Sequence, residues 1–363
     1  MAAVEFLKGV VNFLTNPPVF ITLAAVLFFL LLPRRSFWRP KVILVVGFLA
    51  IAFVAVSMLD PNFALIVKKP DNVPIVAMLF LVVFFLWLSL YQAHANDERI
   101  ERGELPMEAS QGEDQKTWVW PDLVYTELVC MVIGMIILVI WGIAFHAPIE
   151  EPANTARTPN PSKAPWYFLG LQEMLVYYDP WLAGVVFPSL IIVGLMAIPY
   201  IDTNPKGNGY FTFKERRAEI TLFLFGFLIL WVLLVMLGTF LRGPNWNFFG
   251  PYEYWDLHKL LVLNNVNLSE YVWVRWTGWG LPQNMLLREL PGVLLVAFYL
   301  FVLPAVLART LLRRYYEKLG PWRYAVFVML LLGMIALPLK MILRWSPLTL
   351  KYIVAMPEIF FNI

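Results

Sequence analysis

Residues 121–145 read PDLVYTELVCMVIGMIILVIWGIAF, and no charged residue follows Glu127 within this stretch. About 20 consecutive apolar residues in a helix are enough to cross the hydrocarbon core of a bilayer. The run is continuous and lacks the alternation of apolar and polar residues that is typical of a membrane β-strand. These residues therefore predict a membrane-spanning α-helix.

Similar apolar runs lie on both sides of this stretch. Together with it they predict eight spans, at residues 18–32, 42–58, 73–91, 121–145, 181–200, 219–241, 291–307 and 324–339. The second, seventh and eighth runs are short, so seven spans is the alternative. We expect an all-α, polytopic membrane helix bundle, with an additional short surface helix in the loop 146–180.

The composition of the chain agrees with a membrane protein. Of its 363 residues, 60% are hydrophobic and 15% charged, with a net charge of +3; soluble proteins carry about 25% charged residues. These values exclude a soluble enzyme, a disordered protein and a nucleic-acid binder. The single cysteine, Cys130, excludes a disulfide framework and a thiolate metal site within the chain. The first 20 residues lack the basic start and cleavage site of a signal peptide.

The distribution of basic residues predicts the orientation. If the loop after the first span is cytoplasmic, 16 of the 28 lysines and arginines lie in cytoplasmic segments. Positive residues favour the cytoplasmic side. We therefore expect both termini on the outer side of the membrane, which is the periplasm for the bacterial inner membrane that we take as the location.

Loops and spans divide the chain into five parts. Tryptophan prefers the level of the lipid headgroups, and residues 242–288 contain five tryptophans and no run long enough to span. We expect a three-span extension (1–92), a polar cytoplasmic linker (93–120), a three-span core (121–241), an aromatic external segment at the membrane surface (242–288) and a two-span extension (289–363).

The three-span core contains several short motifs in a characteristic order. These are Glu151-Pro152, Thr158-Pro159, Ala164-Pro165-Trp166-Tyr167 and the pair Arg216-Arg217. In this order the core, a third of the chain, resembles the C-terminal, subunit IV-like part of cytochrome b from quinol–cytochrome c oxidoreductases. The resemblance implies a membrane subunit of such a complex, which acts only together with its partners.

The resemblance also implies where quinol is oxidised. In the family the external loop forms part of the quinol-oxidation site, and here that loop offers Ala164, Pro165, Trp166, Tyr167 and Phe168 as quinol-binding residues. The Tyr167 hydroxyl could reach a docked Rieske iron–sulfur protein. The alternative is that Trp166 and Tyr167 only anchor a surface helix at the membrane interface.

The chain departs from the family at the acid of the motif. The family's acidic residue accepts a quinol proton, but here the position is Pro165. Glu173 lies seven residues after Trp166, about two helical turns later, and burial would favour its neutral form, so it is the candidate replacement. His146 is a candidate relay because imidazole titrates near neutral pH. The alternative for Glu173 is a carboxylate exposed to water at the membrane interface, and the alternative for His146 is a helix cap.

Glu127 is the candidate for a second quinone site on the cytoplasmic side. It lies six residues after Pro121, and mitochondrial-type relatives have an aspartate at the matching offset that contacts the quinone being reduced. The alternative is a side chain that extends to the nearby interface.

The histidine count points to partner subunits. Family members hold two b-type haems with histidine pairs, but this chain has only His94, His146 and His258. We therefore expect no haem bound by histidine pairs in this chain. The resemblance implies a haem-bearing cytochrome b N-terminal-type subunit, a Rieske protein, a c-type cytochrome and a dimeric complex.

Two readings of function stay open. A non-acidic residue at the second position of the motif is typical of relatives that use low-potential quinols, so the first reading is a quinol-oxidation subunit that uses menaquinol. The second is a non-catalytic scaffold of such a complex whose quinol site has decayed. Glu173→Gln should slow quinol oxidation about 10²-fold if Glu173 is the proton acceptor, and should have no effect in a scaffold.

Overall fold

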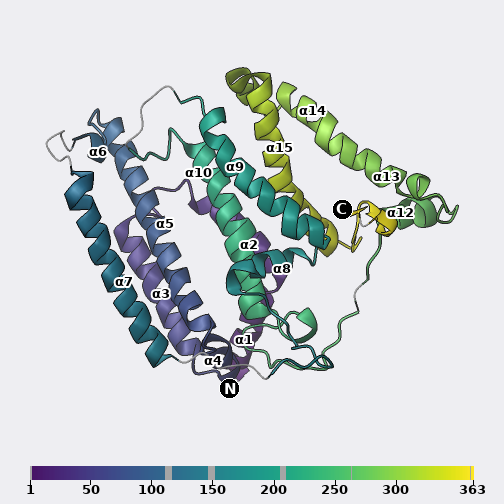
Figure 1. Cartoon of the computed structure of the whole chain (residues 1–363), viewed down its shortest axis with the longest axis horizontal. Helices are drawn as coiled ribbons and strands as arrows, with labels where there is room; N and C mark the ends of the chain where they lie inside the picture. The colour runs from purple at the N-terminus through teal and green to yellow at the C-terminus, as the bar shows by residue number, and fades with distance from the viewer. Residues whose placement is uncertain (1, 111–116, 146–151, 205–209, 263, 360) are drawn as a thin grey trace.

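The computed structural model describes residues 2–110, 117–145, 152–204, 210–262, 264–359 and 361–363 (Figure 1). The first half of the chain folds into α1 (Ala2–Leu14), α2 (Pro17–Leu31), α3 (Pro40–Ser57), α4 (Pro61–Val67), α5 (Asn72–Glu101), α6 (Met107–Ser110), η2 (Val119–Leu123), α7 (Val124–Ala144), η3 (Trp166–Phe168) and α8 (Leu169–Met174). The second half contains η4 (Leu182–Val186), α9 (Phe187–Ile201), α10 (Arg217–Leu224), η5 (Phe225–Val232), α11 (Leu233–Met236), η6 (Leu237–Leu241), η7 (Pro244–Trp246), α12 (Leu268–Glu270), η8 (Tyr271–Trp276), α13 (Met285–Ala297), η9 (Phe298–Val302), α14 (Leu303–Arg309), α15 (Arg313–Trp345) and η10 (Pro357–Ile359). Near the end of the chain, β1 (Ala355–Met356) and β2 (Phe361–Asn362) pair antiparallel.

The expectation of an all-α, multi-span protein is confirmed. Within the described residues, seven helices are long and apolar enough to cross a membrane. They cover residues 40–57, 72–101, 119–144, 182–201, 217–241, 285–309 and 313–345. The first predicted span, residues 18–32, coincides with α2, which meets α1 at a bend of 77°; if that bent pair crosses as one span, the number is eight.

Prolines and caps set the starts of the N-terminal helices. Pro17, Pro40 and Pro61 stand at the first positions of α2, α3 and α4, where the missing N–H of proline costs no helical hydrogen bond. The Asp60 carboxylate accepts hydrogen bonds from the N–H groups of Asn62 and Phe63 and so caps α4. These local signals fold the chain back at the turns between spans.

Contacts between loops define two ends of the molecule. At one end, Arg35 and Lys214 both pair with Glu101, and Arg216 pairs with Asp202 at 2.9 Å. These pairs join turns that the charge pattern places together on the cytoplasmic side. At the other end, the loop 152–165, α8 and the segment after η6 come together (Figure 1). The grouping of the loops agrees with the predicted topology, whereas the side that faces the cytoplasm stays a prediction.

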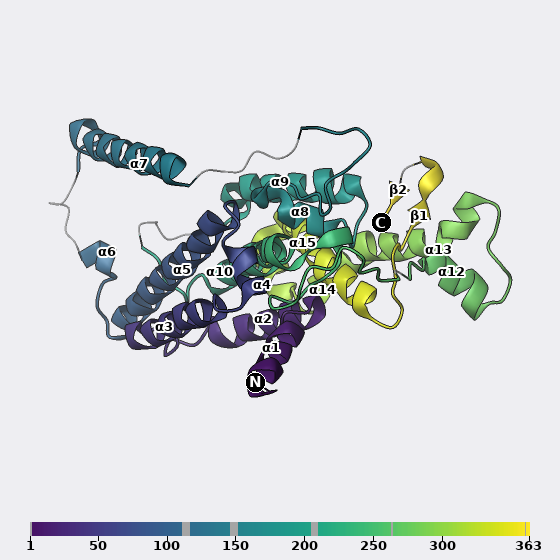
Figure 2. The ribbon, with the colours of Figure 1, turned by 90° about the horizontal axis from the view of Figure 1, so that it is seen from below.

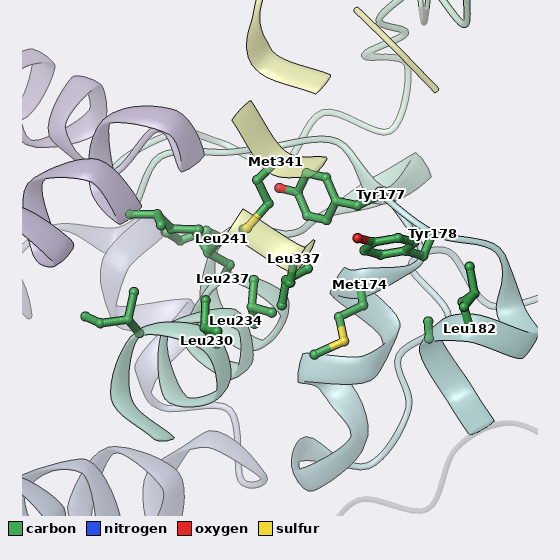
Figure 3. Close-up of a cluster of buried hydrophobic side chains, with 13 residues drawn as sticks. Met174, Tyr177, Tyr178, Leu182, Leu230, Leu234, Leu237, Leu241, Leu337 and Met341 are labelled. Carbon is green, nitrogen blue, oxygen red and sulfur yellow. The ribbon is translucent and has the colours of Figure 1, made fainter. Parts of the chain in front are cut away.

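The largest buried cluster lies where α8 meets the span 217–241. Met174 from α8, Leu234 and Leu237 from that span, and Leu337 from α15 are buried in it (Figure 3). The helices come close because Gly238 lacks a side chain: a Cβ there would lie 3.0 Å from the Leu169 carbonyl oxygen. This close approach fixes α8 against the bundle.

The predicted polar linker begins later than expected. Residues 93–101 were predicted to be solvated, but α5 continues through Glu101, and His94, Asn96 and Asp97 are buried. Asn96 and Asp97 have partners far along the chain: the Asn96 side chain donates to the Phe211 carbonyl oxygen at 3.0 Å, and Asp97 accepts from the Lys214 N–H. Within the described residues the ring nitrogens of His94 have no hydrogen-bond partner. Pattern alone could not predict this extension, because polar residues read as solvent-exposed unless their partners are known.

The helix α7 stands apart from the bundle. None of its residues is buried, and from below it lies well clear of α3 and α5 (Figure 2). Its predicted span is therefore present as a helix, with its apolar surface open over its whole length.

Candidate functional site

A cavity of about 920 Å³ opens at the end of the molecule that contains α8. Four stretches line it: residues 62–75, which comprise α4, the start of α5 and the turn between them; the end of α7; residues 159–169; and residues 253–255. Thr239 of η6 also lines it. This volume lies in the range of about 300–1,000 Å³ that is usual for small-molecule sites. The cavity is therefore large enough for a ring-sized ligand with part of an attached chain.

The first three residues of the predicted motif border the cavity. Ala164, Pro165 and Trp166 all line it. Tyr167 and Phe168, which follow in η3, do not line it and are each 49% exposed. The Trp166 and Tyr167 rings meet edge to face with their centroids 5.7 Å apart. Trp166 thus forms part of the wall, while Tyr167 lies on the surface.

Four side chains hold the motif loop against the bundle. The Gln172 amide of α8 accepts from the Ala164 N–H at 2.9 Å and donates to the Ser162 carbonyl oxygen at 2.8 Å. The Lys163 ammonium donates to the Thr239 carbonyl oxygen at 2.8 Å. The side chains of Asn160 and Asn245 are hydrogen-bonded at 2.9 Å. The loop is thereby tied to α8, to η6 and to η7, which fixes the wall that carries Trp166.

Glu173 lies beneath the loop rather than in the cavity. Its side chain is 0% exposed, and its two oxygens accept from Arg242 at 2.9 and 2.5 Å. The Trp246 indole N–H also donates to it, at 3.1 Å. Because both oxygens are occupied and Glu173 does not line the cavity, this arrangement suits an anchor between α8 and the end of η6 better than a free proton acceptor.

The other predicted site residues lie elsewhere. His146, and with it Glu150 and Glu151, falls outside the described residues. Glu127 is exposed in the first turn of α7. Trp141 in the last turns of that helix lines the cavity, so Glu127 is about 21 Å from it at 1.5 Å per residue. Glu127 and the cavity therefore lie at opposite ends of this span, as a second quinone site would require.

Two further polar residues lie outside the cavity lining. Asp202 ends α9 and pairs with Arg216 through two hydrogen bonds of 3.0 and 2.9 Å. His258 lies on the surface, with its side chain 95% exposed.

The sequence did not indicate several residues that complete the cavity. Lys163 and Trp255 are the most informative, since the Lys163 ammonium lies 5.0 Å from the centre of the Trp255 ring. Lys163 directly precedes the motif, so its position was an available signal. The contribution of the turn between α4 and α5 was not predictable, because it depends on how the N-terminal extension folds back.

No group of three or more histidine, cysteine, aspartate or glutamate side chains in the described part of the chain could hold a metal ion. The chemistry that this end of the molecule offers is therefore aromatic walls, two lysines, Lys69 and Lys163, and two carboxylates, Asp71 and Glu253, on the cavity wall.

Comparison with known proteins gives one family. Residues 152–252 match the family described as cytochrome b(C-terminal)/b6/petD. The matched segment contains the motif loop, α8, the spans of α9 and of α10–η6, and Trp246. The resemblance is confirmed for this part of the chain, and it supports a membrane subunit of a cytochrome bc-type, oxidoreductase complex. The chain matches no solved structure.

Proposed function

We propose that this chain supplies the quinol-oxidation site of a cytochrome bc-type quinol:cytochrome c oxidoreductase. The observation that carries the proposal is that the sequence motif Ala164-Pro165-Trp166 borders the 920 Å³ cavity. The matched family segment covers the motif loop and the elements α8, η6 and η7 to which the loop is hydrogen-bonded. In this proposal Trp166 and the neighbouring aromatic side chains form an apolar wall for the quinol ring.

The proposal assigns the remaining chemistry to partner subunits. Quinol oxidation releases two protons and two electrons, and this chain has no histidine pairs for haem. The electrons therefore go to an iron–sulfur cluster on a Rieske protein and to a b-type haem on a cytochrome b subunit, and then to a c-type cytochrome. The exposed Tyr167 is the contact proposed for the Rieske protein. Glu127 is proposed for a second, quinone-reducing site.

Menaquinol is the proposed substrate. The motif position that is acidic in the family is Pro165 here, and the resemblance associates this change with low-potential quinols. Menaquinol is the common quinol of that class.

The test is quinol-dependent reduction of cytochrome c by the whole complex, purified through a tag on this chain. Trp166→Ala should lower the rate about 10-fold to 10²-fold, because a small displacement of the reacting ring is costly. Trp322→Ala is the matched control, since Trp322 is 85% exposed on α15, and its rate should equal that of the wild type. A complex that assembles but leaves the rate unchanged in Trp166→Ala would support the scaffold instead.

The proposed location is a bacterial inner membrane, with residues 93–120 in the cytoplasm and both termini outside. Ser110→Cys in α6 should be unreactive toward an impermeant thiol reagent in intact cells, and reactive after permeabilisation. Labelling in intact cells would reverse the proposed orientation.

A further inference from the structure

Lys163 is a charged residue that lines the cavity next to the motif. It directly precedes Ala164, lines the cavity and is half-buried. Its ammonium is bound by a neutral partner, the Thr239 carbonyl oxygen at 2.8 Å, and by the face of the Trp255 ring. Among the described residues no carboxylate lies within ion-pair distance of it. A lysine held in this way does not have the partner that would keep it permanently charged.

The surroundings favour the neutral amine further. Burial, together with the positive charge of Lys69, lowers the pKa of Lys163 from its ordinary value of 10.5 to about 7. A base with a pKa near the working pH is best suited to proton transfer. Near neutral pH, a large share of the Lys163 side chains is therefore ready to accept a proton.

The other charged groups around the cavity are already paired. Lys69 and Asp71, from the turn between α4 and α5, lie 3.4 Å apart. Glu253 is paired with Lys259 at 3.5 Å, and Tyr254 adds a phenol to the same wall. Three residues after Thr239, Arg242 is paired with Glu173, and neither residue lines the cavity.

We propose that Lys163 is the first proton acceptor for the quinol in this cavity, at the place where the motif lacks its acid. The proposal rests on the proposed function and names a catalytic residue for it. In the step, a quinol O–H bond breaks and a third N–H bond forms on Nζ, which gives an ammonium and a quinolate anion. No electron moves in this step. Glu253 lines the same cavity and its side chain is 39% exposed, so in this proposal it passes the proton outward to solvent.

The test compares three variants of Lys163 in the whole complex. Lys163→Met removes the base, Lys163→Gln keeps a donor for the Thr239 carbonyl, and Lys163→Arg keeps the charge and the donor but stays protonated. All three should oxidise a menaquinol analogue about 10²-fold more slowly than the wild type. A wild-type rate in Lys163→Arg or Lys163→Gln would overturn the proposal, because Lys163 would then only hold the loop.

The pH profile separates a proton acceptor from a structural lysine. The wild-type rate should rise with pH as the amine loses its proton around pH 7, and then level off. The variants should lack this rise. Lys351→Met is the matched control, because Lys351 also donates to a main-chain carbonyl, that of Val176 at 3.2 Å, but lies outside the cavity; its profile should keep the rise. A Lys163→Met profile with the same rise would overturn the proposal.

A binding measurement separates failure of this inference from failure of the proposed function. An alkyl-hydroxynaphthoquinone, a stable quinol mimic, should bind the wild-type and Lys163→Gln complexes, and Trp166→Ala should weaken both. If the mimic binds but the Lys163 variants turn over normally, only the role of Lys163 fails. If Trp166→Ala leaves binding of the mimic unchanged, the cavity is not the quinol site and both proposals fail.

Discussion

Two spans of similar length and apolar character behave very differently in this fold. In the span 217–241, 39% of the most apolar window is buried, whereas in the span 119–144 none of it is. The first packs against α8 through Gly238 and carries Thr239, which binds Lys163. The second contributes only its last turn, with Trp141, to the cavity. Apolar composition thus predicts that a helix crosses the membrane, but the small and polar residues at particular positions decide whether it packs.

The family match follows the same division. It covers residues 152–252, which include the packed span, and it begins after α7. The function proposed here therefore rests on the part of the chain that contains the largest buried cluster. The exposed helix α7 has the apolar surface of a span that packs against lipid or another subunit.

The largest expected effect comes from the anchor of the packed region. Glu173→Ala leaves the Arg242 guanidinium without its buried partner, so it should destabilise the subunit by about 3–5 kcal/mol. Glu127→Ala, on the exposed α7, should change stability by less than about 0.5 kcal/mol. Thermal unfolding of the purified complex gives both values.

The Glu173→Gln variant distinguishes the anchor from a catalytic base. If Glu173 serves as an anchor, the variant should lower stability and leave the pH profile of the remaining activity as in the wild type. A fully stable variant with a 10²-fold slower rate would show that Glu173 is the proton acceptor and that the ion pair opens during turnover.

Glycine substitutions in the two spans test the difference in packing, and we expect an intermediate change in stability. Gly238→Ala places a methyl group 3.0 Å from the Leu169 carbonyl oxygen and should cost about 1–3 kcal/mol. Gly142→Ala, in α7, meets nothing within 4 Å and should be neutral or stabilising by up to about 1 kcal/mol. Equal effects of the two substitutions on the unfolding temperature would contradict the difference in packing.

The smallest expected effect is at the turn that leads into the packed span. Hydrogen bonds from Arg216 lower the pKa of Asp202 below its ordinary value of 3.8. The resulting stabilisation is present above that pH and is lost as the pH falls through the lowered value. Because the pair is partly exposed, Asp202→Asn should cost about 0.2–1 kcal/mol at pH 7. A difference from wild type that persists unchanged at pH 2 would contradict this assignment.

Sequence reasoning predicted the spans and the motif because both are local signals. Apolar runs of membrane length and the order of Glu151-Pro152, Thr158-Pro159 and Ala164–Tyr167 need no knowledge of distant contacts. The partners of buried polar groups do need it. Arg242 is 69 residues from Glu173 in the chain, and Thr239 is 76 residues from Lys163. For this reason sequence reasoning could not predict the pairing of Glu173 with Arg242, the burial of polar residues at the end of α5, or the contact of Lys163 with Thr239.

The most direct test of the central claim is photolabelling of the whole complex with an azido-menaquinone analogue, followed by peptide mapping. Quinol oxidation in the cavity beside Trp166 predicts a labelled peptide within residues 159–169 of this chain. Excess unlabelled menaquinone should suppress that label, and Trp166→Ala should reduce it. Labelling confined to other peptides, with the 159–169 peptide unmodified, would contradict the proposed quinol site.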